Sequence, residues 1–110
     1  HEGPQIISSN GSVNFKHGMI VSNEPGYYKK NKYGIRIENL ILAKVAKDIL
    51  KFETITFAPL EKQLIDRNFL SREEIQWIDD YHTQVRKHLL PFMNTKQSKW
   101  LKAETEKIIH

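Results

Sequence analysis

The sequence predicts an α+β protein in which antiparallel strands come first and helices follow. Two observations lead to this prediction. Between residues 19 and 57, β-branched residues alternate with other residue types in short runs, which is typical of strands with one buried face. From residue 71 onward, apolar residues instead recur every three or four positions, which is the period of an amphipathic helix. No internal repeat is visible.

The first third of the chain, residues 1–34, is rich in loop-forming residues and holds all five glycines. One strand is expected there, over Met19–Asn23, because apolar and β-branched residues dominate it. We expect this strand to stop at Pro25-Gly26, a pair that favours a type II turn.

Strand-forming sequence continues over residues 35–57. In Ile35–Ala43, β-branched residues recur at alternate positions, so we expect a strand with one buried face. Glu53–Phe57 repeats the pattern and ends before Pro59. The sequence therefore predicts at least three strands before the helices.

A helix is expected over residues 71–90. Ser71 and Glu74 have the spacing of a capping box, in which each side chain binds the other residue's backbone amide. Pro91 marks the end of this helix. The predicted buried stripe consists of Ile75, Ile78, His82, Val85 and Leu89. A second helix is expected over Ser98–Ile109, with Trp100, Leu101 and Ile108 as its apolar contacts.

Composition narrows the classes of function. The chain is 39% hydrophobic and 27% charged, which indicates a globular protein rather than a disordered one. Cysteine is absent, so disulfides and thiolate zinc sites are excluded, and a metal must use carboxylate or imidazole ligands. No apolar run is long enough to span a membrane. The start at His1, without a signal pattern, leads us to expect an interior point of a longer chain.

The net charge of +4 comes largely from lysines in residues 29–32 and 96–107. A basic balance can indicate a nucleic-acid partner. No arginines interleaved with aromatic residues accompany these lysines, so a solvated surface is the preferred interpretation. We therefore expect neither nucleic acid nor a membrane as a partner.

Glu24 and Glu38 lie equally far from Asn31 in the sequence, one on each side of it. If residues around Asn31 form a bend between antiparallel strands, then Glu24 and Glu38 are close to being cross-strand partners, with side chains about 5 Å apart. Two such carboxylates repel unless a positive charge lies between them. A divalent metal pair is one candidate for that charge, and Arg36 is another. By spacing alone, two solvated glutamates remain the commoner case.

The sequence around these glutamates resembles a known family. Residues 22–28 and 33–39 resemble the two C-terminal metal-ligand motifs of the pita-bread metallopeptidases, which include Xaa-Pro aminopeptidase, prolidase and methionine aminopeptidase. Residues 1–4 resemble a histidine motif of aminopeptidase P. The tail from residue 52 is similar to the C-terminal extension of the long, three-domain form of that enzyme, and the match weakens after about residue 94.

This resemblance implies specific roles. Glu24 and Glu38 would be carboxylate ligands of a dinuclear site, with Glu38 bridging the two metals and Glu24 also accepting a proton. His1 would hydrogen-bond the substrate, and Arg36 would hold a carboxylate in position or form a plain ion pair. The cofactors would be two divalent metal ions, with manganese the first choice and zinc the second. The family's other three ligands would lie upstream of residue 1, so the chain alone is expected to be inactive.

The resemblance also implies how the chain is divided into domains and what the parent protein does. Residues 1–60 would be the C-terminal part of the pita-bread catalytic domain, and residues 61–110 a helical extension. The parent protein would be a cytoplasmic metalloaminopeptidase acting on peptides with proline at the second position. It would form a homodimer through the extension, to which four residues could contribute unless they form the extension's own core: Trp77, Tyr81, Trp100 and Leu101.

Three alternatives stay open: a prolidase-like dipeptidase, a catalytically inactive pita-bread module used for binding, and a small basic nucleic-acid-binding domain. The remaining histidines do not supply the missing ligands. His17 is expected at the surface, His82 packed and hydrogen-bonded, and His88 and His110 without a site. Tyr27 and Tyr28 line a pocket or simply pack.

Overall fold

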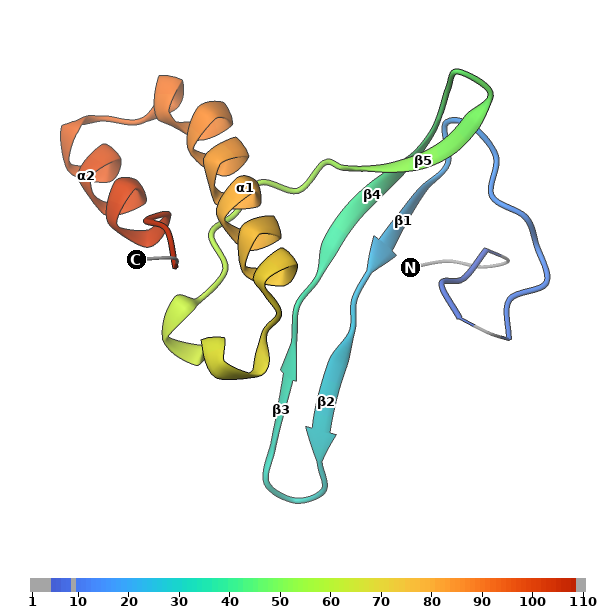
Figure 1. Ribbon diagram of the computed structural model, residues 1–110, viewed down its shortest axis with the longest axis horizontal. Helices are drawn as coiled ribbons and strands as arrows, with labels where there is room; N and C mark the ends of the chain where they lie inside the picture. Colours follow the sequence, from blue (N-terminus) through green and yellow to red (C-terminus); the bar gives the residue numbers. More distant parts are fainter. Residues whose placement is uncertain (1–4, 9, 109–110) are drawn as a thin grey trace. The chain divides into compact units, whose positions relative to one another are not determined.

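The structure is a computed structural model that describes residues 5–8 and 10–108. It divides into two compact units, His1–Thr56 and Phe57–His110. All strands of the described residues lie in the first unit and both α-helices in the second (Figure 1). The predicted α+β order is confirmed. Within the described residues, no helix is both long and apolar enough to cross a membrane.

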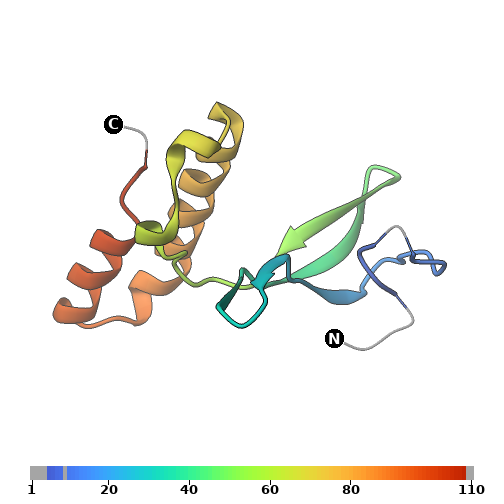
Figure 2. The same cartoon turned by 90° about the horizontal axis from the view of Figure 1, so that it is seen from below.

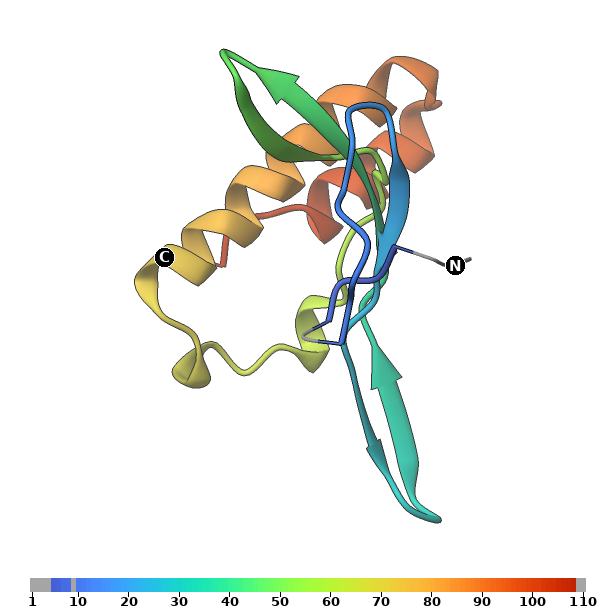
Figure 3. The same ribbon diagram turned by 90° about the vertical axis from the view of Figure 1, so that its right-hand side faces the viewer.

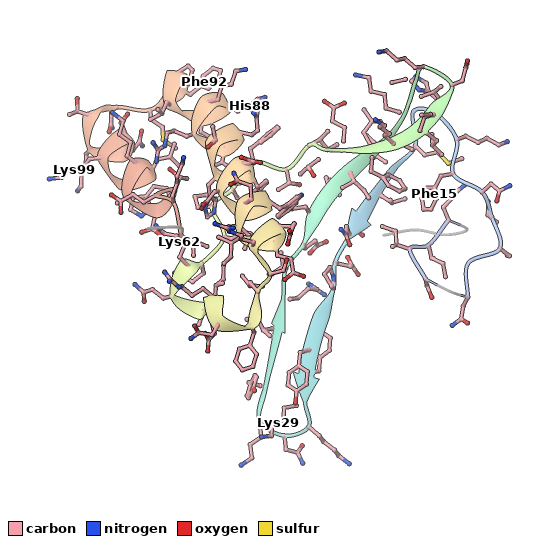
Figure 4. All side chains as sticks on the ribbon, viewed as in Figure 1. Phe15, Lys29, Lys62, His88, Phe92 and Lys99 are labelled. Atoms are coloured by element: carbon pink, nitrogen blue, oxygen red, sulfur yellow. The ribbon has the colours of Figure 1, made fainter. Side chains whose placement is uncertain are left out.

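The first unit contains two antiparallel sheets, and two short chain segments connect one sheet to the other. The three-stranded sheet has the order β1-β4-β5, and the two-stranded sheet consists of β2 and β3. The strands are β1 (Ile20–Asn23), β2 (Gly26–Lys29), β3 (Tyr33–Arg36), β4 (Asn39–Ala46) and β5 (Ile49–Thr54). The β2–β3 hairpin extends beyond the three-stranded sheet, and Lys29 lies at its tip (Figures 3 and 4).

The bend of this hairpin lies where the sequence placed it, around Asn31. Asn31 has a φ of 57°, in the left-handed region that asparagine tolerates better than most residues. The amide of Lys32 closes the turn by donating to the carbonyl oxygen of Lys29 at 3.0 Å. The hairpin prediction is therefore confirmed.

The predicted type II turn at Pro25-Gly26 is wrong. Gly26 is the first residue of β2 and pairs with Arg36, and it is not among the residues with positive φ. Packing explains both this glycine and Gly34: a Cβ atom at either position would lie 2.7 Å from an atom of the Tyr28 side chain. These glycines leave space for a tyrosine ring rather than making a turn.

The predicted strand over residues 35–43 is interrupted, and part of its expected buried face is exposed. β3 ends at Arg36 and β4 begins at Asn39. Ile41 is buried at 7% exposure, whereas Ile35 and Ile37 are 40% and 45% exposed. The reason is that, among the described residues of this unit, no second layer covers the two-stranded hairpin.

The strand expected at Glu53–Phe57 instead runs over Ile49–Thr54, so it begins and ends earlier than predicted. It begins at Ile49 because a tight turn joins it to β4. Lys47 and Asp48 form this turn with φ values of 51° and 62°. Two consecutive positive φ angles are typical of a type I′ hairpin turn, which usually contains glycine or asparagine. A Lys-Asp pair carries a weak turn signal, so the sequence did not predict it.

The second unit contains α1 (Arg72–Leu89) and α2 (Thr95–Glu104) (Figure 2). Short 3₁₀ turns precede and follow α1: η1 (Lys62–Leu64), η2 (Arg67–Phe69) and η3 (Leu90–Phe92). The predicted capping box is present: Ser71 Oγ accepts from the Glu74 amide at 3.1 Å, and Glu74 Oε2 accepts from the Ser71 amide at 2.8 Å. Pro91 lies in η3, directly beyond the helix end.

The second helix begins earlier and ends earlier than predicted. Asn94 caps it, with Gln97 completing a reciprocal capping box, so helical structure begins at Thr95 rather than at Ser98. Thr105 follows its last turn, so the prediction that it continued to Ile109 is wrong for the described residues. The capping signal Asn-x-x-Gln was the sequence feature that should have placed its start.

The core of the second unit lies between the two helices. Tyr81, Val85 and Leu101 are buried in one cluster. The residues packed around them are Phe57, Leu60, Leu89, Leu90 and Met93. The predicted helix stripe is confirmed at Ile78, His82 and Val85, which are all buried. Trp77 and Trp100 are each 53% exposed and lie outside this core.

Replacing Leu101 by alanine should destabilise the second unit by about 2–5 kcal/mol, because its side chain is fully buried and the truncation leaves a cavity. Thermal or urea unfolding followed by circular dichroism measures the loss. Trp100→Ala, at the neighbouring half-exposed position, is the matched control and should cost clearly less. An equal cost for both variants would contradict the assignment of Leu101 to the core.

Candidate metal-binding site

The two glutamates singled out by the sequence lie at matching interruptions of the two sheets. Glu24 lies between β1 and β2, and Glu38 lies between β3 and β4. The β1–β4 ladder ends with the pair Asn23↔Asn39, and the β2–β3 ladder begins with Gly26↔Arg36. These two pairs belong to one register, in which Glu24 is opposite Glu38.

A hydrogen bond inside the interruption supports this continuity. The Ile37 amide donates to the Pro25 carbonyl oxygen at 3.1 Å, although neither residue belongs to a strand. The two chain segments therefore stay side by side between the ladders (Figure 1). Opposite residues of antiparallel segments extend their side chains from the same face. The register thus places the Glu24 and Glu38 side chains on one face, as the sequence predicts.

Arg36 forms an ion pair with Glu38, with 3.7 Å between Nε and Oε2. The side chains are 51% and 47% exposed, so solvent screens the pair and it adds little stability by itself. Arg36 lies two residues before Glu38 and therefore on the same side of the chain. The contact restricts the orientation of the Glu38 carboxylate, which is the geometry expected of a positioning residue and equally of a plain surface pair.

His1, the fourth predicted site residue, lies outside the described residues. The histidines that the structure describes have structural contacts rather than a common site. His17 is exposed, as expected, but its Nδ1 accepts a hydrogen bond from the Val45 amide at 2.9 Å, which the sequence did not predict. His82 is fully buried and hydrogen-bonded, as predicted. His110 also lies outside the described residues.

The strands of the β2–β3 hairpin, which follow and precede the two glutamates, contain three tyrosines. Tyr27, Tyr28 and Tyr33 are each more than half exposed, and the rings of Tyr27 and Tyr33 lie 6.1 Å apart. The Tyr28 ring lies across the two glycines of the hairpin. Both packing and a role in a larger binding surface remain compatible with these tyrosines.

A cavity of about 250 Å³ lies beside the β1–β4 ladder. It contains one buried hydroxyl, Ser22 Oγ, which has no hydrogen-bond partner among the described residues. Ser22 is two residues before Glu24, so this hollow is near the candidate ligands. Its lining residues are Gln5, Ile6, Ile7, Ile20, Val21, Ser22 and Leu40. The sequence did not predict this cavity.

Comparison with known proteins identifies the family. Residues 48–108 match the model of the C-terminal region of peptidase M24, and residues 1–44 match the model of metallopeptidase family M24. The chain belongs to the M24 metallopeptidase family. The boundary between the two matched ranges lies near the turn between β4 and β5. The boundary between the two compact units instead follows Thr56.

Individual M24 relatives agree with this assignment. Aminopeptidase P1 of Arabidopsis thaliana is 41% identical over 119 aligned positions, which cover 98% of this chain and 18% of the relative. A probable Xaa-Pro aminopeptidase P of Coprinopsis cinerea is 42% identical over 121 positions, covering 98% of this chain and 20% of the relative. The chain thus spans about a fifth of the length of these relatives, and it corresponds to their C-terminal portion.

A solved M24 structure has the same fold. The X-prolyl aminopeptidase of Caenorhabditis elegans superposes with a TM-score of 0.74 and 34% identity, covering 98% of this chain and 19% of that one. That protein is described as a cytosolic enzyme with a di-nuclear active site. The antiparallel strands and two helices of this chain match the C-terminal region of the pita-bread fold.

The donor set of the hairpin fits part of such a metal centre. Two carboxylates on one face supply hard oxygen ligands, which suit Mn²⁺ and can accept Zn²⁺. Within residues 5–8 and 10–108, however, no group of three or more His, Cys, Asp or Glu side chains could hold a metal ion. The register thus places two carboxylates together, and a tight metal site would need further ligands besides them.

The register makes a direct prediction, because the natural chain contains no cysteine. The double variant Glu24→Cys/Glu38→Cys should form an intramolecular disulfide on mild oxidation, since opposite Cβ atoms lie about 4.5–5.5 Å apart, close to the separation that a disulfide spans. Non-reducing mass spectrometry detects the bond. The matched control is Glu24→Cys/Asn39→Cys, in which the second thiol lies on the other face. Equal oxidation of both variants would contradict the register.

Proposed function

We propose that this chain forms the part of a dinuclear-metal Xaa-Pro aminopeptidase that supplies two carboxylate ligands, Glu24 and Glu38. The observation that carries the proposal is their opposite placement in one hairpin register, in a chain that belongs to the M24 family. Glutamates that only contact solvent would not require positions opposite each other in the register. The proposal is further supported by the names of the relatives that this chain matches, which are aminopeptidase P1 and probable Xaa-Pro aminopeptidase P.

Each site residue then has a distinct role. Glu38 would be a ligand shared by both metal ions, and its charge would offset part of theirs. Glu24 would be a ligand of one metal ion and would also act as the proton acceptor. Arg36 holds the Glu38 carboxylate through the 3.7 Å ion pair. His1 donates a hydrogen bond to the substrate, where it steadies charge that develops on the carbonyl oxygen.

Metals explain why two carboxylates are placed together. When bound, a pair of divalent cations lowers the pKa of a water molecule and polarises the scissile carbonyl. Manganese is the first choice, because both ligands from this chain are carboxylates, and zinc is the second. The proposed substrates are peptides with proline at the second position. The bond before proline lacks an N–H, so a peptidase that recognises this donor cannot bind it in the usual way.

The two units have separate tasks in this proposal. Residues 1–60 contribute to the pita-bread catalytic domain, and residues 61–110 form a helical extension that pairs two copies of the protein. Half-exposed Trp77 and Trp100 support such pairing, because large aromatic side chains are enriched in interfaces. A cytoplasmic location agrees with the absence of cysteine and with the cytosolic relative from C. elegans.

The bridging role can be tested in a chimera in which this chain replaces the matching C-terminal segment of the A. thaliana relative. Glu38→Gln should lower hydrolysis of an Arg-Pro-Pro peptide by at least about 100-fold and should lower bound metal, because the variant keeps the shape and loses the charge. Glu53→Gln is the control: Glu53 is a similarly exposed strand glutamate that pairs with Lys44. It should change neither quantity.

Full activity of the Glu38→Gln chimera, with metal bound, would disprove the bridging role. An Arg-Pro dipeptide separates the enzymatic alternatives, because a prolidase-like enzyme cleaves it in preference to the tripeptide. A chimera that folds, binds no metal and cleaves neither peptide would favour the inactive binding module.

The chain alone should hydrolyse no Xaa-Pro peptide, even with millimolar Mn²⁺ or Zn²⁺. Two carboxylates leave a hard cation largely hydrated, so its bound water is not made acidic enough to react. Release of the first residue of Arg-Pro-Pro is followed with each metal, and titration calorimetry measures metal affinity. Chelator-sensitive turnover that disappears in Glu24→Ala would show that these two ligands suffice.

A further inference from the structure

The segment from Phe57 to Lys62, which we call the strap, leads into the helical unit and is held against α1 by side chains of that helix. Tyr81 binds it twice: its hydroxyl donates to the Ala58 carbonyl oxygen at 2.8 Å and accepts from the Ala58 amide at 3.2 Å. His82 Nε2 accepts from the Leu60 amide at 2.9 Å. Two consecutive helix residues therefore hold two alternate strap residues.

A third contact lies two turns further along α1. The His88 ring stacks on Phe57, with 3.9 Å between ring centroids and 9° between ring planes. At the other end of the strap, Lys62 Nζ donates to the Ala103 carbonyl oxygen at 2.9 Å. Lys62 follows Leu60, the residue that His82 contacts, by two positions. His88 of α1 thus contacts the first residue of the strap, and Lys62 is its last residue; both are labelled in Figure 4.

The hydrogen bond to Leu60 fixes the protonation state of His82. A backbone amide donates its proton, so Nε2 must carry a lone pair and the proton of the neutral ring must be on Nδ1. The His82 side chain is fully buried, and Nδ1 has no hydrogen-bond partner among the described residues. His82 therefore holds the strap only while the ring is neutral.

The surroundings of His82 favour this neutral form. Burial is the main cause that lowers the pKa of His82 below its ordinary value of 6.5, followed by the positive charge of Lys62. Arg86 on α1 acts in the same direction, while Asp79 on α1 opposes it. Asp79 is itself 3% exposed, and its Oδ1 accepts from the Ile108 amide at 2.8 Å.

We propose that His82 is an acid-sensitive latch that fastens the strap to α1. A proton added to Nε2 turns the acceptor into a second donor, so the Nε2–H and the Leu60 N–H face each other and the hydrogen bond is lost. The same proton creates a cation in a site that excludes water and contains two other positive groups. Opening the strap removes both the clash between the two N–H groups and the cost of the buried cation, because it exposes the ring and the Leu60 amide to solvent.

The direction of the pH effect follows from linkage. The open form takes up a proton near pH 6.5, whereas the closed form resists protonation to lower pH. The closed strap therefore has its full stability above about pH 6.5 and loses it progressively as the pH falls toward the lowered pKa. Within this window, the population of the open strap should rise about ten-fold for each pH unit.

His88 provides a matched control on the same helix. Its Nδ1 lies 2.8 Å from the Gln84 carbonyl oxygen, which can only accept, so Nδ1 is already a donor. A second proton on the exposed Nε2 removes no hydrogen bond. His88 also contacts the strap, but its contact does not depend on a neutral ring.

The test compares the full chain with the variants His82→Gln and His88→Gln. Glutamine places an amide oxygen near the position of Nε2, so it can accept from Leu60 at every pH. Amide hydrogen exchange of Leu60 is measured between pH 7.5 and 5 and corrected for the intrinsic rate. In the wild type and His88→Gln, protection should fall as the pH drops below 6.5, with a slope that approaches ten-fold per pH unit until the lowered pKa of His82 is reached; in His82→Gln it should not.

Unchanged Leu60 protection in the wild type across this range would overturn the proposal, and so would an equal pH dependence in His82→Gln. If His82→Gln does not fold, NMR of the wild-type imidazole nitrogens decides. The latch requires an unprotonated Nε2 at pH 7.5 and protonation of the ring in step with the loss of Leu60 protection. A ring that titrates without any change at Leu60 would rule it out.

Discussion

The candidate site depends on one constraint, which is the register shared by the two ladders on either side of Glu24 and Glu38. Backbone hydrogen bonds fix this register on both sides, from Asn23↔Asn39 to Gly26↔Arg36. A slip of one residue would move one carboxylate to the opposite face and separate the pair. The left-handed turn at Asn31 prevents such a slip, because the number of residues in the bend is set by the turn.

The two units differ in how completely they bury their own apolar residues. The helical unit has a core in which Val85 and Leu101 are fully buried. The strand unit is a single layer, so large residues such as Ile20, Tyr28 and Phe52 are at least half exposed. A sheet layer becomes stable when another layer covers its apolar face. For a chain that spans about a fifth of its M24 relatives, the exposed face of the hairpin is consistent with a role as one part of a larger catalytic domain.

Histidine illustrates how the same residue type serves different ends in this chain. His17 accepts from the Val45 amide and helps to hold the loop before β1 against β4, whereas His82 accepts from Leu60 inside the helical unit. In both cases a ring nitrogen accepts a hydrogen bond from a backbone amide. Neither ring lies in a group that could bind a metal among the described residues. In the proposed metal site, the ligands from this hairpin would therefore be carboxylates.

The sequence by itself determined the order of strands and helices, the capped start of α1 and the bend at Asn31, because these follow from local periodicity and local hydrogen bonding. It also predicted that Glu24 and Glu38 lie opposite each other in the register if the chain bends at Asn31, since a hairpin bend fixes its own pairing. Tertiary structure decided which apolar residues are buried: Ile35 and Leu101 look alike in sequence, but only Leu101 has a second layer packed on it. Gly26 likewise looked like a turn residue, and only the position of the Tyr28 ring showed that it is a packing residue. Burial and close packing depend on residues distant in the chain, and no local pattern contains that information.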